Sequence, residues 1–338
     1  MRFSHAVTWL AVLYFWVNTV AAQTMAITGA GASFPAPLYQ RWAQDAQRDT
    51  QIQLNYQSIG SGGGINQIMA RTVDFGATDA PLSEERLAQN NLIQVPITMG
   101  AVVLAYNLPG VQPGALRLTP DVLADIYLGR ITRWTDARIV SINSHIRIPN
   151  LPLGVVYRGD GSGTTWIFTN YLSRVSDTWK AQTGSGTNVS WPAGQGARGN
   201  EGVSNMVQRT PGLIGYMELS FAQVNRLSMA QLQNAHGAFV QSTTETNLAT
   251  AQNANWGSTL VPDLINQPGQ LTWPIMGATY ILIPTNPPQA MRSRAVTDWI
   301  TWALTNGDGA AERLFYVPLP ATIKQQVQQQ MRERIQLP

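Results

Sequence analysis

Three glycine-rich segments of this sequence each carry hydroxyl side chains and stand directly before a stretch with helical character. They are Thr28–Pro35, Ile59–Gly64 and Arg158–Thr165, and the last of them also contains an arginine. A glycine-rich turn at the start of a helix can direct backbone N–H groups, hydroxyl donors and one fixed positive charge at a single anion. The arginine segment therefore predicts an oxyanion cradle, and the other two segments have the same character.

The order of strand-like and helix-like runs around these turns predicts an α/β fold. Between Ile27 and Asn107, β-like runs alternate with helix-like runs such as 65–71 and 83–90. Such alternation is typical of a mainly parallel sheet with helices on its faces. The segment from about 118 to 271 forms a second lobe that delivers the arginine turn, and a strand at 279–283 with two later helices is expected to return to the first lobe.

These patterns divide the chain into a leader and two lobes. We expect a signal peptide over 1–22, a first lobe formed by 23–107 plus 275–338, and a second lobe formed by 108–274. Two connections between lobes suit hinge closure around a ligand. The length of 338 residues is sufficient for this organisation.

The N-terminus has the order of a secretory signal. Arg2 precedes an apolar run from Ala6 to Val20, and the small residues Ala21 and Ala22 follow. A retained membrane anchor is the alternative, but the run is short for a bilayer span of about 20 residues. The chain has no cysteine, which suits a periplasmic or secreted protein with a core large enough to need no disulfide.

Composition argues against several kinds of partner and cofactor. The formal charge is only +3 and the basic residues are scattered, whereas nucleic-acid binding needs clustered cations. Only three histidines occur, and with no cysteine a zinc or copper site is not expected. We therefore expect no nucleic-acid partner, no metal and no cofactor, and any bound anion to be small.

Asp79 is the candidate that decides which anion is bound. It follows a short apolar run, and the carboxyl ends of strands line the ligand crevice of open α/β sheets. It could instead cap a helix beginning near Leu82. In an anion site a carboxylate is repulsive unless the anion carries a proton that the carboxylate can accept. Asp79 would thus separate a protonated oxyanion such as phosphate from fully ionised sulfate.

Arg158 is the candidate for the fixed positive charge. It could be a surface residue, but it stands directly before a Gly-Asp-Gly-Ser-Gly run. Asp160 is its natural partner, because a carboxylate can orient the guanidinium fork and reduce the net charge of the site.

Several segments together resemble the periplasmic phosphate-binding protein of the high-affinity phosphate ABC importer, the PstS family. The matching segments cover essentially the whole chain after the leader and are 28–37, 56–64, 72–83, 125–129, 158–164 and 208–216. The resemblance implies a two-lobed, type II periplasmic binding protein fold with two mixed sheets flanked by helices. Inorganic phosphate would lie in the cleft between the lobes, and the partner would be a membrane ABC permease. By the same analogy, the protein is expected to be monomeric.

The resemblance also implies a phosphate-binding set in this numbering. The matched positions are Ser33, Phe34, Ser61, Asp79, Arg158, Ser162, Gly163 and Thr164, with Asp160 as the ion-pair partner of the arginine. Two positions depart from the family pattern: Ser33 stands where threonine is frequent, and Gly62 where another serine is common. Neither change removes a primary donor.

Two other functions compete with phosphate capture. A secreted phosphatase would use Ser61 or Ser162 as nucleophile, but neither serine lies in a nucleophile elbow or has a histidine near it in sequence. A binding protein for another tetrahedral oxyanion, for example arsenate, sulfate or molybdate, is the second alternative. Asp79 argues against the unprotonated anions but not against arsenate.

Overall fold

A nine-stranded mixed sheet runs through the computed structural model, which describes residues 24–257 and 259–336. The order is β2-β1-β3-β12-β4-β8-β6-β7, and β9 pairs with β4. A small sheet has the order β11-β10-β5. The strands are β1 (Met25–Gly31), β2 (Ile52–Ser58), β3 (Phe75–Thr78), β4 (Leu92–Tyr106), β5 (Arg117–Leu118), β6 (Gly154–Arg158), β7 (Gln195–Ala197), β8 (Leu213–Glu218), β9 (Ser228–Met229), β10 (Gln231–Gln233), β11 (Phe239–Val240) and β12 (Met276–Pro284).

The long strand β4 joins two sheets into this single path. Its 15 residues are all buried. The stretch 92–101 pairs antiparallel with β12, and 102–106 pairs antiparallel with β8. The sequence predicted only the second stretch as a strand. The two sheets are mixed, because β1, β2 and β3 are mutually parallel, as are β6, β7 and β8, while β12 and β4 run against their neighbours.

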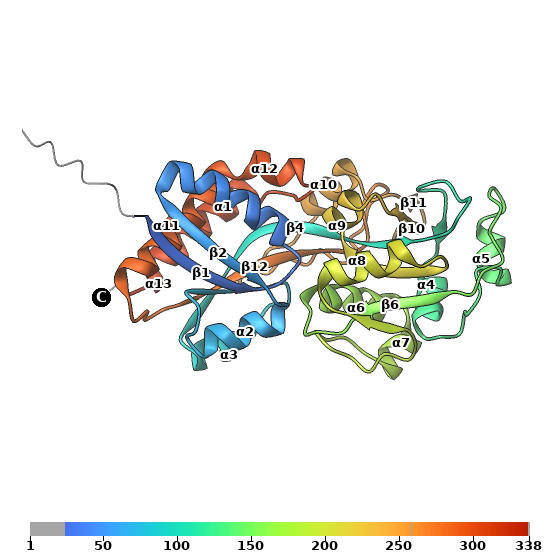
Figure 1. The fold of residues 1–338 in the computed structure, drawn as a ribbon, viewed down its shortest axis with the longest axis horizontal. Helices are drawn as coiled ribbons and strands as arrows, with labels where there is room; N and C mark the ends of the chain where they lie inside the picture. Colours follow the sequence, from blue (N-terminus) through green and yellow to red (C-terminus); the bar gives the residue numbers. More distant parts are fainter. Residues whose placement is uncertain (1–23, 258, 337–338) are drawn as a thin grey trace, which may run out of the picture.

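Helices cover both faces of the first sheet (Figure 1). On one face α1 packs on β2 and α11 packs on β1, while α2 packs on β1 and β3 from the other face. The alternation of side chains along a strand produces this arrangement: Ile27 belongs to one hydrophobic cluster with Trp42, and Ala30 belongs to another with Ile65. The helices of this part are α1 (Ala36–Thr50), α2 (Ser61–Met69), α3 (Glu84–Gln89), α11 (Ala290–Asn306), α12 (Asp308–Arg313) and α13 (Ala321–Arg334).

The second sheet has its own helices. α6 and α8 both pack on β8, and α8 also contacts β6. The helices of this part are α4 (Pro120–Tyr127), α5 (Ala137–Ile142), α6 (Gly163–Val175), α7 (Asp177–Gln182), α8 (Gly199–Arg209), α9 (Leu219–Val224) and α10 (Thr244–Gln252). As predicted from Pro at the first helical position, α4 begins at Pro120 with Thr119 as its N-cap.

The C-terminal elements return to the first sheet, as the sequence predicted. Strand β12 inserts between β3 and β4, and α11 contacts α1 and β1. Within residues 24–257 and 259–336, none of the helices combines the length and apolarity needed to cross a membrane. The predicted signal peptide over 1–22 lies outside the described residues.

Candidate functional site

Three parallel strands end beside one another and place the first group of predicted site residues. Ser33 follows β1, Ser61 begins the helix after β2, and Asp79 follows β3 directly. Because the carboxyl ends of parallel strands lie at the same edge of a sheet, the three side chains converge there. We call Ser33, Phe34, Ser61 and Asp79 the N-terminal half-site.

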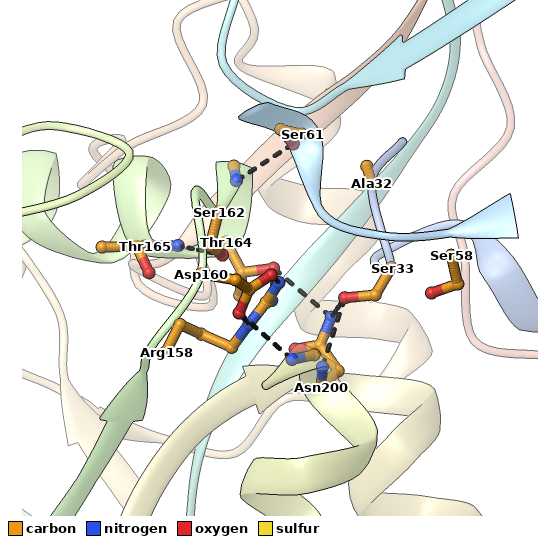
Figure 2. Close-up of polar contacts among 12 residues, drawn as sticks. Ala32, Ser33, Ser58, Ser61, Arg158, Asp160, Ser162, Thr164, Thr165 and Asn200 are labelled. Atoms are coloured by element: carbon orange, nitrogen blue, oxygen red, sulfur yellow. Dashed lines mark hydrogen bonds and ion pairs between the residues drawn. The ribbon is translucent and has the colours of Figure 1, made fainter. Parts of the chain in front are cut away.

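The second group comes from one strand, one turn and one helix. Strand β6 ends at Arg158, and the turn leads to Ser162, which is the N-cap of α6. We call Arg158, Asp160, Ser162, Gly163 and Thr164 the arginine half-site. Figure 2 shows Ser33 and Ser61 of the first group together with Arg158, Asp160, Ser162 and Thr164 of the second.

The structure brings the two half-sites into direct contact. The Gly163 N–H donates to the Ser61 hydroxyl at 3.0 Å, and the Gly62 N–H donates to the Gly161 carbonyl at 2.9 Å. Phe34 is fully buried, and its carbonyl accepts a hydrogen bond from the Tyr316 hydroxyl at 2.6 Å. All predicted ligand residues are buried, and Arg158, at 2% exposure, is among the largest buried side chains. The structure is therefore closed over the site.

Arg158 is fixed in place from three directions. Its Nε and Nη2 donate to the two Asp160 carboxylate oxygens at 2.8 and 2.6 Å, and Nη1 lies 3.4 Å from the Thr164 hydroxyl. Its backbone N–H donates to the Tyr216 hydroxyl at 3.0 Å. The Tyr216 ring stacks on Phe168 with centroids 4.4 Å apart. A bidentate ion pair of this kind fixes the plane of the guanidinium group.

Asp160 is ionised despite its position in the interior. Burial raises the pKa of its carboxyl, but the hydrogen bonds and charge of Arg158, with the Gly199 N–H at 3.1 Å, lower the pKa below its ordinary value. The pair of Arg158 and Asp160 is thus close to neutral as a unit. Asp160 accepts from Nε and Nη2, so an anion bound here would meet the guanidinium N–H groups that Asp160 does not occupy, together with uncharged donors.

The hydroxyl groups of the site are arranged as donors. A serine or threonine hydroxyl has two lone pairs and one hydrogen. Ser33 Oγ accepts the backbone and side-chain N–H groups of Asn200 at 3.2 and 2.9 Å. Ser61 Oγ accepts the Asp79 N–H at 3.2 Å as well as that of Gly163. With both lone pairs occupied, each hydroxyl has only its hydrogen left to offer.

The Thr164 hydroxyl also faces two N–H donors, whereas the Ser162 hydroxyl accepts one. Thr164 Oγ1 lies 3.4 Å from a guanidinium nitrogen of Arg158 and 3.4 Å from the Asn200 amide nitrogen. Ser162 Oγ accepts the Thr165 N–H at 3.1 Å as the N-cap of α6. The N-termini of α1, α2, α6 and α8 also meet at this place, and their partial positive charge favours an anion.

Asp79 is the one carboxylate of the N-terminal half-site, and it faces the arginine half-site. Its Oδ1 accepts the Thr279 hydroxyl at 2.7 Å. A methyl group placed on Gly163 would lie 2.5 Å from Oδ2, so this oxygen is directed across the interface. The alternative that Asp79 caps a helix is wrong, because α3 begins at Glu84 and Ser83 caps it.

Burial places the protonation of Asp79 near neutral pH. Burial raises the pKa of its carboxyl to about 7, although the Thr279 hydrogen bond, the charge of Arg158 and the Ser61 hydroxyl each lower the pKa. The Asp79 carboxyl therefore gains or loses its proton in the same pH range as an oxyanion such as phosphate. An anion that brings its own proton can bond to Oδ2, whereas an anion without one meets a carboxylate.

Sequence reasoning missed four residues that complete the site. Asn200 contacts Ser33 and Thr164, Thr279 holds Asp79, and the Tyr316 hydroxyl bonds to the Phe34 carbonyl and lies 3.1 Å from the Glu218 carboxyl. Asn200 had a usable signal, because Gly199-Asn200-Glu201-Gly202 is a further glycine-containing segment, and it opens helix α8 directly after β7. The other three lie in apolar or aromatic runs without a local mark.

The described residues of the site contain no group of side chains that could hold a metal ion. Among residues 24–257 and 259–336, no three histidine, aspartate or glutamate side chains are gathered in a way that could hold an ion. The carboxylates of the site are instead bound to Arg158, Thr279 and Ser220.

Comparison with known proteins agrees with this geometry. The family model described as a PBP superfamily domain matches residues 17–306. The chain is 44% identical over 328 residues to the phosphate-binding protein PstS of Pasteurella multocida, covering 96% of this chain and 95% of that protein. The corresponding protein of Haemophilus influenzae is 43% identical, with 93% and 95% covered.

Solved structures agree in fold at lower identity. A soluble ancestral variant of the human phosphate-binding protein has a TM-score of 0.73 at 21% identity, with 90% of this chain and 93% of that chain covered. This likeness confirms the predicted two-lobed, type II α/β fold with two mixed sheets.

Proposed function

Because the chain belongs to the PBP superfamily and to its PstS phosphate-binding proteins, we propose that the contact between the two half-sites is its phosphate site. The protein captures inorganic phosphate between the lobes for import by an ABC transporter. It is a binding protein and not an enzyme, in keeping with its relatives.

One observation carries the assignment of the site. The hydroxyl oxygens of Ser33 and Thr164 each face two N–H groups, so their hydrogens remain for an anion. The Arg158 guanidinium group supplies the positive charge, and Asp79 supplies a single acceptor. A buried tetrahedral anion needs a donor for nearly every oxygen lone pair, because unpaired buried polar groups are costly. Many donors and one acceptor suit an oxyanion that carries one proton.

Each predicted residue has a role in this proposal. In the N-terminal half-site, the hydroxyls of Ser33 and Ser61 and the backbone N–H groups of the loop at Ser33 and Phe34 donate to phosphate, and Asp79 Oδ2 accepts the phosphate proton. In the arginine half-site, Arg158 and the hydroxyls of Ser162 and Thr164 donate, and the Gly163 N–H, which bonds to Ser61 Oγ in this structure, lies beside them. Asp160 orients Arg158 through its two hydrogen bonds.

The proton that phosphate carries and sulfate lacks separates the two anions in this proposal. Sulfate at neutral pH has no hydrogen to donate, so its oxygen would face Asp79 without a shared proton. A site built to accept a ligand hydrogen rejects an analogue without it by about 10⁴-fold. Arsenate has the same charge, shape and proton as phosphate, and this argument does not exclude it.

The lobe boundaries belong to the proposal. Residues 23–107 with 275–338 form one lobe and 108–274 the other. The chain crosses from the first sheet to the second within β4, between its stretches 92–101 and 102–106, and crosses back before β12. This division is supported by the pairing of β12 with β3 and β4, and of β8 with β6. Release of phosphate requires the lobes to separate about these crossings, because the site is buried when they are closed.

The family assignment also supports the setting in which the protein works. The relatives are phosphate-binding proteins PstS, and solved structures of this fold include a putative phosphate ABC transporter substrate-binding protein and a periplasmic phosphate-binding protein, each with bound phosphate. For this chain we propose cleavage of the leader after residue 22, a periplasmic monomer, and docking of the closed form on the permease.

Isothermal titration of the purified protein with phosphate and with sulfate tests the function. Phosphate is expected to bind in a single site, with sulfate weaker by about 10⁴-fold. Equal affinity for the two anions, or no phosphate binding, would contradict the proposal. Release of phosphate from a chromogenic ester, lost in Ser162→Ala, would favour the phosphatase alternative instead.

A further inference from the structure

Asn200 lies between the two half-sites, although no sequence motif singled it out. It is the second residue of α8, beyond the carboxyl end of β7, and it is fully buried. Strand β7 is parallel to β6, so Asn200 reaches the same sheet edge as Arg158. Figure 2 shows its side chain between Ser33 and the arginine half-site.

The orientation of the Asn200 amide group is determined by its partners. Its Oδ1 accepts the Glu218 backbone N–H at 3.1 Å. The side-chain nitrogen must therefore point the other way, where it donates to Ser33 Oγ at 2.9 Å and lies 3.4 Å from Thr164 Oγ1. Both amide hydrogens and the carbonyl oxygen are thus directed by named groups, and a flipped amide would place its NH2 group against the Glu218 N–H, donor against donor.

This orientation determines what the Ser33 hydroxyl can do. Its two lone pairs accept the backbone and side-chain N–H groups of Asn200, which leaves only its hydrogen for another group. Without the side-chain donor, one lone pair would be open and the hydroxyl could rotate to accept. A hydroxyl that must be reoriented on binding contributes less to affinity than one already held as a donor.

The geometry points to Asn200 as a positioning residue that holds the Ser33 hydroxyl as a donor to the bound phosphate when the lobes close, an inference that rests on the proposed function. Asn200 follows β7 in the sheet of the arginine half-site, and Ser33 follows β1 in the other sheet. Their hydrogen bonds therefore cross between the half-sites. Closure and the donor orientation of Ser33 are coupled through this one side chain.

Two substitutions of Asn200 test its side chain in different ways: one replaces the amide donor and keeps the shape, and the other removes the side chain. Asn200→Asp keeps an oxygen for the Glu218 N–H but presents Ser33 with a carboxylate oxygen, which takes the hydroxyl hydrogen away from phosphate and adds a negative charge. Asn200→Ala removes the side chain, while the backbone N–H still bonds to Ser33. We expect phosphate affinity to fall about 100-fold in Asn200→Asp and about tenfold in Asn200→Ala.

A matched control uses an exposed contact of the same helix. Glu201 follows Asn200 in sequence, and its Oε1 lies 3.4 Å from Ser58 Oγ. This contact is exposed and lies outside the buried site. Ser58→Ala is expected to change phosphate affinity less than twofold. Thermal unfolding without phosphate checks that each variant is folded, and Asn200→Ala carries the test if the charged variant does not fold.

A double-mutant cycle with Ser33→Ala distinguishes positioning from general damage. If Asn200 acts through the Ser33 hydroxyl, Asn200→Ala changes phosphate affinity less than twofold once Ser33 is alanine. Equal losses in both backgrounds, or unchanged affinity in both Asn200 variants, would overturn the inference while leaving the phosphate site in place. A wild-type protein that does not bind phosphate would overturn the proposed function itself.

Discussion

The two half-sites reach the same interface by different routes. The arginine half-site is local, since Arg158, Asp160, Ser162, Gly163 and Thr164 lie within one strand, turn and helix start. The N-terminal half-site is assembled from the ends of three strands. The local half carries the positive charge, and the assembled half carries the acceptor. The difference suggests that attraction for anions and choice among anions are separate properties of the protein.

The two halves also hold their charged groups differently. Arg158 is bound by an ionised carboxylate through two short hydrogen bonds, whereas Asp79 is bound by the neutral Thr279 hydroxyl. A charged partner keeps the plane of the Arg158 guanidinium group oriented. Burial raises the pKa of Asp79 to about 7 in spite of its Thr279 hydrogen bond, which leaves the carboxyl open to share a proton.

Removing the charge of the arginine half-site is expected to have the largest effect. Arg158→Ala deletes the guanidinium donors to phosphate and leaves Asp160 buried without its cation. At about 2 kcal/mol for each charge-assisted hydrogen bond, two lost bonds weaken phosphate binding by about 10³-fold. Titration calorimetry measures the loss, with exposed Arg209→Ala as the control for net charge. A loss of less than tenfold would show that neutral donors supply most of the attraction.

A single methyl group at the interface tests whether both halves must meet. In Gly163→Ala the added carbon would lie 2.5 Å from Asp79 Oδ2 and 2.6 Å from Ser61 Oγ, too close for the closed form. We expect phosphate affinity to fall about 100-fold, because closure must shift buried side chains.

Gly62→Ala is the matched substitution on the opposite half. Its added carbon would meet the Gly161 Cα at 3.3 Å, which a small adjustment relieves. We expect less than a threefold change in phosphate affinity. Similar losses in both variants would mean that contact between the halves does not depend on the Gly163 position.

Asp79→Asn tests whether the N-terminal half-site selects phosphate over sulfate. The amide cannot accept the phosphate proton as a carboxylate does, and it can donate to an unprotonated oxygen. Phosphate affinity is expected to fall about tenfold and sulfate affinity to rise, so that the ratio between them shrinks by at least 100-fold. Competition titration of sulfate against phosphate measures the ratio. Unchanged rejection of sulfate would assign selectivity to the arginine half-site instead.

The same contrast between local and assembled regions explains what the sequence could predict. The arginine half-site was predicted completely as a group, because the strand, the turn and the N-cap are adjacent in sequence. Helix starts with local signals were also predicted correctly, as at Ser83 and Thr119. The roles of the site residues remain predictions until binding is measured.

Features that depend on distant partners were not predicted. The first part of β4 contains Pro96, which speaks against a central strand. In the structure the register with β12 shifts between Thr279 and Tyr280, opposite Pro96, and a bulge there accommodates the proline. Thr279 lies at this irregular place, so neither its strand position nor its bond to Asp79 could be inferred from nearby residues.

Glu218 extends the comparison to a second buried carboxyl, at the end of β8. Burial raises its pKa to about 8, against the lowering effect of the hydrogen bonds from Ser220 and Tyr316. It is therefore largely neutral at pH 7, and Glu218→Gln imitates that form. We expect the smallest change in phosphate affinity from this variant, less than threefold, in contrast to Asp79→Asn.

Stability without phosphate is where the two carboxyls should behave alike. Both carboxyls have a pKa in the folded state above the ordinary value, so the folded state binds more protons than the unfolded state. The free energy of unfolding therefore falls as pH rises. The window runs from about pH 4 to about pH 7 for Asp79 and from about pH 4.5 to about pH 8 for Glu218. Each group contributes a slope of about 1.4 kcal/mol per pH unit within its window. Denaturant unfolding across this range should show a shallower decline in Asp79→Asn and in Glu218→Gln. An unchanged decline in Glu218→Gln would mean that Glu218 is ionised in the folded protein, and that only the N-terminal half-site holds a carboxyl that shares its proton near neutral pH.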